Sequence, residues 1–216
     1  MSHETPYNPL DKKNLGISVA DALLERCPGT LPPADPIVGA GIYAIYYVGD
    51  SPEYDHIAKA NRDEHYDAPI YVGKAVPAGA RKGGALFGAS QTRALYNRLR
   101  EHADSIEQAT NLALSDFRCR YLVVDDIWIP LGESLLIDMF EPAWNRVIDG
   151  FGNHDPGAGR SKQQRSAWDV LHPGRPWAEK LQDNNRTREE LLDNLERFLT
   201  HKHAEVIDPP YVDEGE

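Results

Sequence analysis

The sequence predicts a mixed α/β (α+β) fold in which a small sheet is flanked by helices. Two segments, 41–48 and 69–73, are rich in tyrosine and β-branched residues and are bordered by glycine or proline, which is typical of strands. Elsewhere, apolar residues recur at helical spacing. The chain has 216 residues, which is enough for one sizeable core.

The segments around the first strand carry weaker signals. Residues 1–16 are polar without a clear period, and we expect an arm there. A short helix is predicted over 19–26, before the turn-rich run from Pro28 to Pro33. After the strand, residues 49–68 are acidic and irregular, with a helix predicted at 54–62.

Beyond the second strand, residues 75–91 contain four glycines and little periodicity, and they predict a long loop. Thr92 is the expected cap of a helix whose Leu95, Leu99 and Ile106 share one face. A third strand is predicted at 117–124, and Pro130 is expected to open a helix that runs to Phe140.

The C-terminal part begins with a glycine-rich, basic stretch, 150–166, which predicts loop structure. Thr187 and Glu190 form a capping-box pattern. The helix that follows is expected to bury one apolar face, made of Leu191, Leu192, Leu195, Phe198 and Leu199. The last twelve residues are acidic and contain proline, and we expect a frayed tail.

Composition is that of an ordinary soluble protein, with 41% hydrophobic and 26% charged residues. No apolar run has the length of a membrane span, and the polar N-terminus lacks a signal-peptide pattern. Cys27 and Cys119 are too few for a disulfide framework or a zinc site. We therefore expect a reduced, cytoplasmic protein without a membrane partner.

The net charge of −11 is unevenly distributed. Residues 74–102 hold six basic residues and one acidic residue, and residues 160–175 hold four and one. The acidic residues concentrate at 48–68, with six against two basic residues, and at 179–216, with eleven against five. Such segregation favours a basic cleft on an acidic body, and phosphate binding needs only the cleft. A merely solvated mixed surface is the alternative.

Two strings, Gly41-Ile42-Tyr43 and Tyr71-Val72-Gly73-Lys74, stand at the predicted strands and are followed by further polar residues in a fixed order. Arg98 and His102 are four apart and so share a helix face. Asn145 lies twelve residues after Glu133, with Pro142 between them. In this order and spacing, the chain resembles the GIY-YIG nuclease family over about residues 39–148.

The resemblance implies a small, three-stranded, mainly antiparallel sheet flanked by helices, with inserted loops and extra terminal helices. It implies a single endonuclease domain over 1–216, with the core at about 39–148 and a C-terminal extension at 149–216. Insertions are expected at about 48–68 and 75–91, because 27 residues separate Tyr43 from Tyr71 and 26 separate Tyr71 from Arg98, more than is common in the family.

Hydrolysis of a phosphodiester needs a nucleophile, charge stabilisation and help for the leaving alkoxide. Glu133 is a hard carboxylate suited to Mg²⁺, or to another hard divalent cation such as Mn²⁺. Arg98 offers a planar fork of donors for the scissile phosphate. His102, one helical turn on, is expected to orient a water or tyrosine, or to share a proton.

A tyrosine is the candidate general base, although ionising a phenol at neutral pH costs about 4 kcal/mol without a stabilising field. Lys74 and the metal are expected to supply that field. The residues leave open which tyrosine takes the proton; we favour Tyr43, with Tyr71 hydrogen bonding or positioning water. Asn145 is implied to hold the site together. Tyr46 and Tyr47 are expected in the core, and adjacent His154 and Asp155 are read as a coincidence.

A compact nuclease with internal insertions resembles the type II restriction endonucleases of the family, most closely the small subgroup that cuts CCGCGG. The implied partners are double-stranded DNA, a second copy in a homodimer on a palindrome, and a cognate DNA methyltransferase. Side chains expected to contact DNA are Arg81, Lys82, Arg93, Arg160, Lys162 and Arg165. The alternatives are a structure-specific repair or recombination nuclease, or a DNA-binding protein without catalysis.

Overall fold

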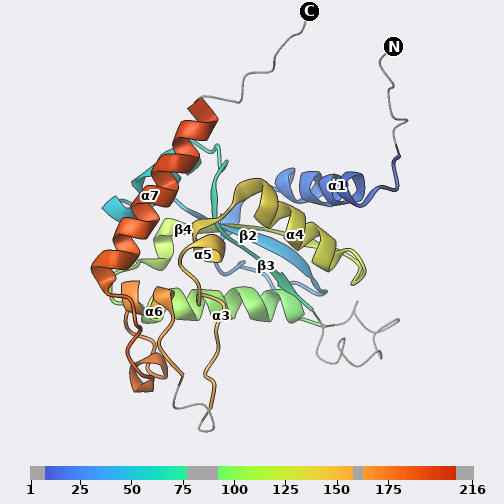
Figure 1. The fold of residues 1–216 in the computed structure, drawn as a ribbon. Coiled ribbons are helices and arrows are strands. Elements are labelled where there is room, and N and C mark those ends of the chain that lie inside the picture. The colour runs from blue at the N-terminus through green and yellow to red at the C-terminus, as the bar shows by residue number, and fades with distance from the viewer. Residues whose placement is uncertain (1–7, 77–91, 158–162, 208–216) are drawn as a thin grey trace, which may run out of the picture.

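The computed structural model describes residues 8–76, 92–157 and 163–207, with side chains through His201 (Figure 1). Its sheet has the order β1-β4-β2-β3 and is antiparallel throughout. The strands are β1 (Gly29–Thr30), β2 (Gly41–Tyr47), β3 (Pro69–Ala75) and β4 (Phe117–Val123). The three predicted strands are confirmed, and the sheet gains a fourth, β1, where the sequence predicted a turn.

β2 lies inside the sheet and is buried along its whole length. Its odd positions, such as Tyr43 and Tyr47, belong to one apolar cluster, and its even positions, such as Ile42 and Tyr46, belong to the other. This alternation follows from the two-residue period of a strand. The prediction that Tyr46 and Tyr47 are core residues is confirmed, because their exposed fractions are 0% and 2%.

Helices cover both faces of the sheet (Figure 1). On the face of Ile42 lie α1 (Lys12–Leu24) and α4 (Ile129–Phe140), which also contact each other. The opposite face packs against α3 (Ala94–Gln108) and the C-terminal helices. The remaining helices are η1 (Pro52–Tyr54), α2 (Asp55–Asn61), η4 (Leu114–Asp116), α5 (Ala143–Arg146), α6 (Ala167–Leu171), η6 (Ala178–Lys180) and α7 (Arg188–Ile207).

The N-terminal ends of three helices show how well capping residues in the sequence predict where a helix begins. The capping box is confirmed: Thr187 Oγ1 accepts from the Glu190 amide at 3.2 Å, and Glu190 Oε2 accepts from the Thr187 amide at 2.8 Å. α1 starts at Lys12, within the predicted arm, because Asp11 caps it by accepting from the Lys13 amide. The predicted cap Thr92 is wrong; Arg93 precedes α3 without a side-chain capping bond.

Several sequence predictions fall where the structure gives no description. The predicted loop 75–91 starts inside β3, and its residues from 77 onward lie outside the described ranges. The predicted tail, 205–216, is wrong at its start, because residues 205–207 belong to the last turn of α7 (Arg188–Ile207), and its residues from 208 onward lie outside the described ranges. Within the described residues, no helix is both long and apolar enough to cross a membrane.

Candidate active site

The two tyrosine strings meet because β2 and β3 pair with Tyr43 opposite Gly73. A Cβ atom on Gly73 would lie 2.4 Å from the Tyr43 hydroxyl oxygen and 2.6 Å from the ring carbon that bears it. Only glycine at this position therefore lets the Tyr43 ring lie across β3. The glycine of the second string thus makes room for the tyrosine of the first.

Tyr43 and His102 form a buried pair. The Tyr43 hydroxyl and His102 Nε2 are 2.6 Å apart, and the two residues are 0% and 1% exposed. Burial, together with Tyr71, raises the pKa of Tyr43 well above its ordinary value, although Arg98 opposes the shift. Burial, together with Arg98, lowers the pKa of His102 well below its ordinary value. The phenol is thus protonated and the imidazole neutral at neutral pH.

Tyr71 is the more accessible of the two tyrosines and is half-buried. Its ring centroid lies 6.3 Å from that of Tyr43 and 5.2 Å from that of His102. Burial raises the pKa of Tyr71, with a further contribution from Glu133, while Arg98 opposes the shift. Both phenols therefore face the same cation, Arg98, and the same carboxylate, Glu133.

Arg98 extends from α3 toward the loop that follows α5. Its Nη2 donates to the Gly152 carbonyl at 2.8 Å. Its Nη1 donates to Glu101 Oε2 at 2.9 Å and lies 2.6 Å from His154 Nε2. The guanidinium is therefore held beside the tyrosines by contacts at both Nη1 and Nη2. A phosphate can displace the two side chains, Glu101 and His154, that contact Nη1.

Lys74 and Glu133 form an ion pair at the edge of the cluster. Lys74 Nζ donates to Glu133 Oε2 at 2.5 Å, and their side chains are 41% and 18% exposed. Gly132 lets α4 approach both α1 and β2, because a Cβ there would lie 2.6 Å from a methyl carbon of Val19 in α1 and 3.1 Å from one of Ile42 in β2. This close approach sets the position of Glu133 next to β3.

The residues fit a lightly coordinated hard cation. Glu133 is a part-exposed carboxylate, and among the described residues no group of three or more His, Cys, Asp or Glu side chains forms a fuller ligand cage. Mg²⁺ commonly binds through one or two carboxylates, retains several waters and takes further ligands from a substrate phosphate. Glu133 is the residue that would hold it.

Asn145, at α5, is joined to the backbone of β3. Its Nδ2 donates to the Val72 carbonyl, and its Oδ1 accepts from the Val72 amide, both at 2.8 Å. Among the described strands, β3 lies at the edge of the sheet, so these bonds use main-chain groups that none of the other described strands pairs. Asn145 thus fixes the segment that carries Tyr71 and Lys74.

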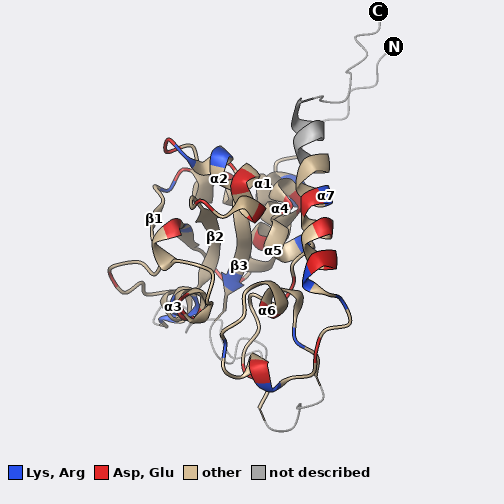
Figure 2. Ribbon diagram, turned by 90° about the vertical axis from the view of Figure 1, so that its left-hand side faces the viewer, with Lys and Arg blue, Asp and Glu red and all other residues tan. Residues whose placement is uncertain are grey.

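The residues expected to contact DNA are only partly described. Arg93 is exposed at the start of α3. Arg165 forms an ion pair with Asp183 after the loop at 150–157. Arg81, Lys82, Arg160 and Lys162 lie outside the described residues. Acidic residues recur along α7 (Figure 2).

Residues 150–154 were predicted as loop from the sequence, but their contacts with the site residues were not. The Phe151 ring stacks on the His102 ring with centroids 4.4 Å apart, and Gly152 and His154 contact Arg98. A Cβ on Gly152 would lie 2.8 Å from the Tyr71 hydroxyl oxygen. The only sequence signal was the glycine-rich composition, and His154, which was read as a coincidence, contacts a site residue.

The chemistry of this cluster suits a phosphodiester. It contains hydroxyl groups of adjustable acidity, a cationic fork, a hard carboxylate beside a lysine, and a neutral histidine. Those groups are able to bind an anionic ester, orient a water and receive its proton.

Comparison with known proteins agrees with this chemistry. The family model described as the Eco29kI GIY-YIG domain matches residues 35–199, which is more than half of the chain. A comparison with curated proteins finds no match. The matched region includes both tyrosine strands, α3, α4, Asn145 and most of α7. The chain therefore belongs to the Eco29kI-type GIY-YIG family, a family of restriction nucleases that act on DNA.

Proposed function

We propose that this protein is a type II restriction endonuclease that makes Mg²⁺-dependent double-strand breaks at a palindromic DNA site. The observation that supports the proposal is the convergence of both tyrosines, Arg98 and Glu133 from four different elements. A protein that only bound DNA has no chemical need for that arrangement.

Arg98 is the proposed phosphate ligand. In the structure it shares Nη1 between Glu101 and His154, while Nη2 is bound to the Gly152 carbonyl. A scissile phosphate is a stronger acceptor than an imidazole nitrogen and competes with Glu101 for Nη1. The Gly152 contact keeps the fork in place during this exchange.

Tyr43 is the proposed base, and His102 is its proton partner. When neutral His102 accepts from the Tyr43 hydroxyl, the phenol oxygen carries more negative charge; as that oxygen takes a proton from water, its own proton passes to His102 Nε2. Tyr71, which is half-buried, is placed to orient that water. The choice between the tyrosines stays a prediction.

Glu133 is the proposed metal ligand, and Lys74 keeps its carboxylate in place until the metal binds. A Mg²⁺ ion held by Glu133 would supply positive charge to the leaving oxygen and to the phosphoryl group. The role of Lys74 is electrostatic, since its ammonium group contacts the Glu133 carboxylate directly.

The target site follows from the family resemblance. We propose recognition of CCGCGG, a homodimer with one site for each strand, and a cognate methyltransferase that protects host DNA. The inserted segments and the basic residues predicted above are the proposed base-reading and phosphate-contacting parts, with Arg93 exposed at the start of the catalytic helix α3.

The test is to incubate the protein with an unmethylated plasmid of known sequence, with Mg²⁺ and, as control, with EDTA. We expect discrete bands that require Mg²⁺, and sequencing of the ends gives the target, the cut position and the overhang together. A smear, or an intact plasmid that carries CCGCGG, contradicts the proposal. Preferential cleavage of junction oligonucleotides supports the structure-specific alternative instead.

A further inference from the structure

A buried arginine lies in the C-terminal extension, on no element that supplies the proposed catalytic residues. Arg175 is 1% exposed, and its Nε donates to Asp169 at 2.7 Å. Its two other nitrogens donate to main-chain carbonyls: Nη2 to Gly150 at 3.0 Å, and Nη1 to Phe151 at 3.2 Å and Asn153 at 3.4 Å. The guanidinium thus binds one carboxylate and three carbonyls of a single short loop.

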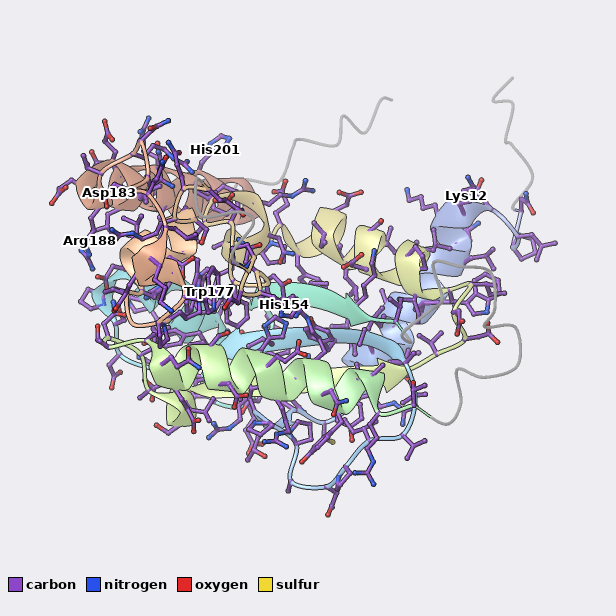
Figure 3. The ribbon with its side chains drawn as sticks, turned by 90° about the horizontal axis from the view of Figure 1, so that it is seen from below. Lys12, His154, Trp177, Asp183, Arg188 and His201 are labelled. Atoms are coloured by element: carbon purple, nitrogen blue, oxygen red, sulfur yellow. The ribbon has the colours of Figure 1, made fainter. Side chains whose placement is uncertain are left out.

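Two indole rings also pack against the Arg175 guanidinium. The Arg175 guanidinium carbon lies 4.4 Å from the Trp168 ring centroid and 4.6 Å from that of Trp177. Trp177 and His154 line the same cavity, and Figure 3 shows their labels near each other, above α3 in the view. A planar fork is required here, because a point-charge ammonium cannot reach the carboxylate and all three carbonyls at once.

Burying a charge is costly, and Asp169 alone would neutralise it. The carbonyl contacts go beyond neutralisation, since they fix the path of residues 150–154. That path matters because Phe151 stacks on His102 and Gly152 accepts from Arg98. The loop that Arg175 holds therefore contacts both Arg98, the proposed phosphate ligand, and His102, the proposed proton partner.

We propose that Arg175 is a positioning residue of the nuclease site, acting through residues 150–154 on Arg98 and His102. The proposal rests on the proposed function. The loop has little room to shift without disturbing the site, because a Cβ on Gly152 would already lie 2.8 Å from the Tyr71 hydroxyl oxygen and 3.0 Å from Arg98 Nη2. A displacement of about 1 Å at such a site can lower the rate by about 100-fold.

The test compares Arg175→Lys with Arg120→Lys, a matched control in β4. Arg120 also donates to carbonyls, those of Arg26 and Tyr66, and its guanidinium carbon also lies over two rings, at 5.1 Å and 5.8 Å. Those rings, Tyr46 and Tyr66, pack in the cluster of α1 and α4, away from residues 150–154. Both substitutions keep the charge and remove the fork.

The first readout is single-turnover cleavage with Mg²⁺, alongside the DNA Kd measured with Ca²⁺ in its place. For Arg175→Lys we expect a rate at least about tenfold lower, with a Kd within about twofold of wild type. Arg120→Lys is expected to keep both within about twofold, whatever its thermal midpoint. A wild-type rate in Arg175→Lys, or a Kd that weakens as much as the rate, overturns the proposal.

The second readout needs no DNA. The ring protons of His102 experience the ring current of stacked Phe151, so their NMR shifts report the position of the loop. We expect them to move in Arg175→Lys and to stay in Arg120→Lys; unmoved shifts in a folded Arg175→Lys contradict the role. If wild type cuts no DNA, the proposed function fails, and these shifts still decide whether Arg175 positions the loop.

If Arg175→Lys does not fold, Gly152→Ala tests the loop without touching the buried charge. The added methyl meets Tyr71 and Arg98 directly. We expect the same loss of rate at unchanged Kd, and a wild-type rate in this variant contradicts the inference that the path of residues 150–154 sets the site.

Discussion

The Tyr43 hydroxyl and the His102 ring lie in an interior that disfavours charge on either group. Their 2.6 Å hydrogen bond lets a proton shift between them without creating an isolated ion. Tyr71, which is half-buried beside them, is the more exposed of the two phenols, and in the proposed mechanism it holds the water whose proton Tyr43 accepts. At the scale of residues, the mechanism depends on which of these two phenols is the general base and which one positions the water.

Phenylalanine variants test that division. Tyr43→Phe removes the proposed base and is expected to lower single-turnover cleavage by about 10²–10⁴-fold, the usual range for a general base. Tyr71→Phe removes only a water contact and should cost less. A larger loss in Tyr71→Phe than in Tyr43→Phe would assign the base to Tyr71. The DNA Kd, measured with Ca²⁺, serves as control and should change little in both.

At the scale of elements, β3 depends on a partner that is not a strand. Asn145 bonds both main-chain groups of Val72, which sit on the free side of this edge strand. The same segment carries Tyr71 and Lys74, so the stability of the strand and the geometry of the site are linked.

Asn145→Ala should lower the free energy of unfolding by about 1–3 kcal/mol, because two hydrogen bonds are lost and the Val72 groups are left without a protein partner. Urea unfolding measures the change. Asn194→Ala, which removes an amide oxygen that accepts from Arg197 on α7, is the control and should stay within about 0.5 kcal/mol. Equal effects of the two substitutions would contradict the role assigned to Asn145.

The elements also show how far sequence reasoning reaches. β2, β3 and β4 were predictable because their β-branched and aromatic residues carry a local signal. β1 was not, since its two residues are held by pairing with β4. The start of α1 was missed because Gly16 is a poor helix former, and its fit against Leu135 of α4 appears only in three dimensions.

The candidate site likewise contains residues that the sequence predicted and residues that it did not. Tyr43, Tyr71, Arg98 and Glu133 were predicted from spacing and resemblance, and the structure brings them together. Phe151, Gly152 and Arg175 were not predicted as site residues, because their importance arises from packing between distant segments. In the sequence, Gly73 indicates only the end of a strand, and its role in making room for the Tyr43 ring is visible only in the structure.

At the scale of the whole molecule, buried histidines couple stability to pH. Burial lowers the pKa of His172 to about 3, and burial with Arg98 lowers the pKa of His102 well below 6.5. The unfolded chain binds protons at both positions below about pH 6.5, whereas the folded chain binds them only when the pH falls to its own, lowered pKa values. The stabilisation is therefore complete above that pH and is lost as the pH falls.

The expected slope is up to about 1.4 kcal/mol for each pH unit and each histidine as the pH falls below about 6.5. Urea unfolding at about pH 5 and about pH 7.5 measures it. His172→Gln removes one titrating group and should reduce the slope by about half. A flat profile between the two pH values would rule out buried, neutral histidines.

The account depends most on a metal-dependent site built around Glu133. The direct measurement is cleavage of unmethylated plasmid by wild type and by Glu133→Gln, with Mg²⁺, at protein concentrations where both bind DNA. The account predicts discrete fragments from wild type and a rate lower by about 100-fold or more from the variant, as for loss of one preorganised electrostatic contact. Equal Mg²⁺-dependent cleavage by both proteins would contradict it.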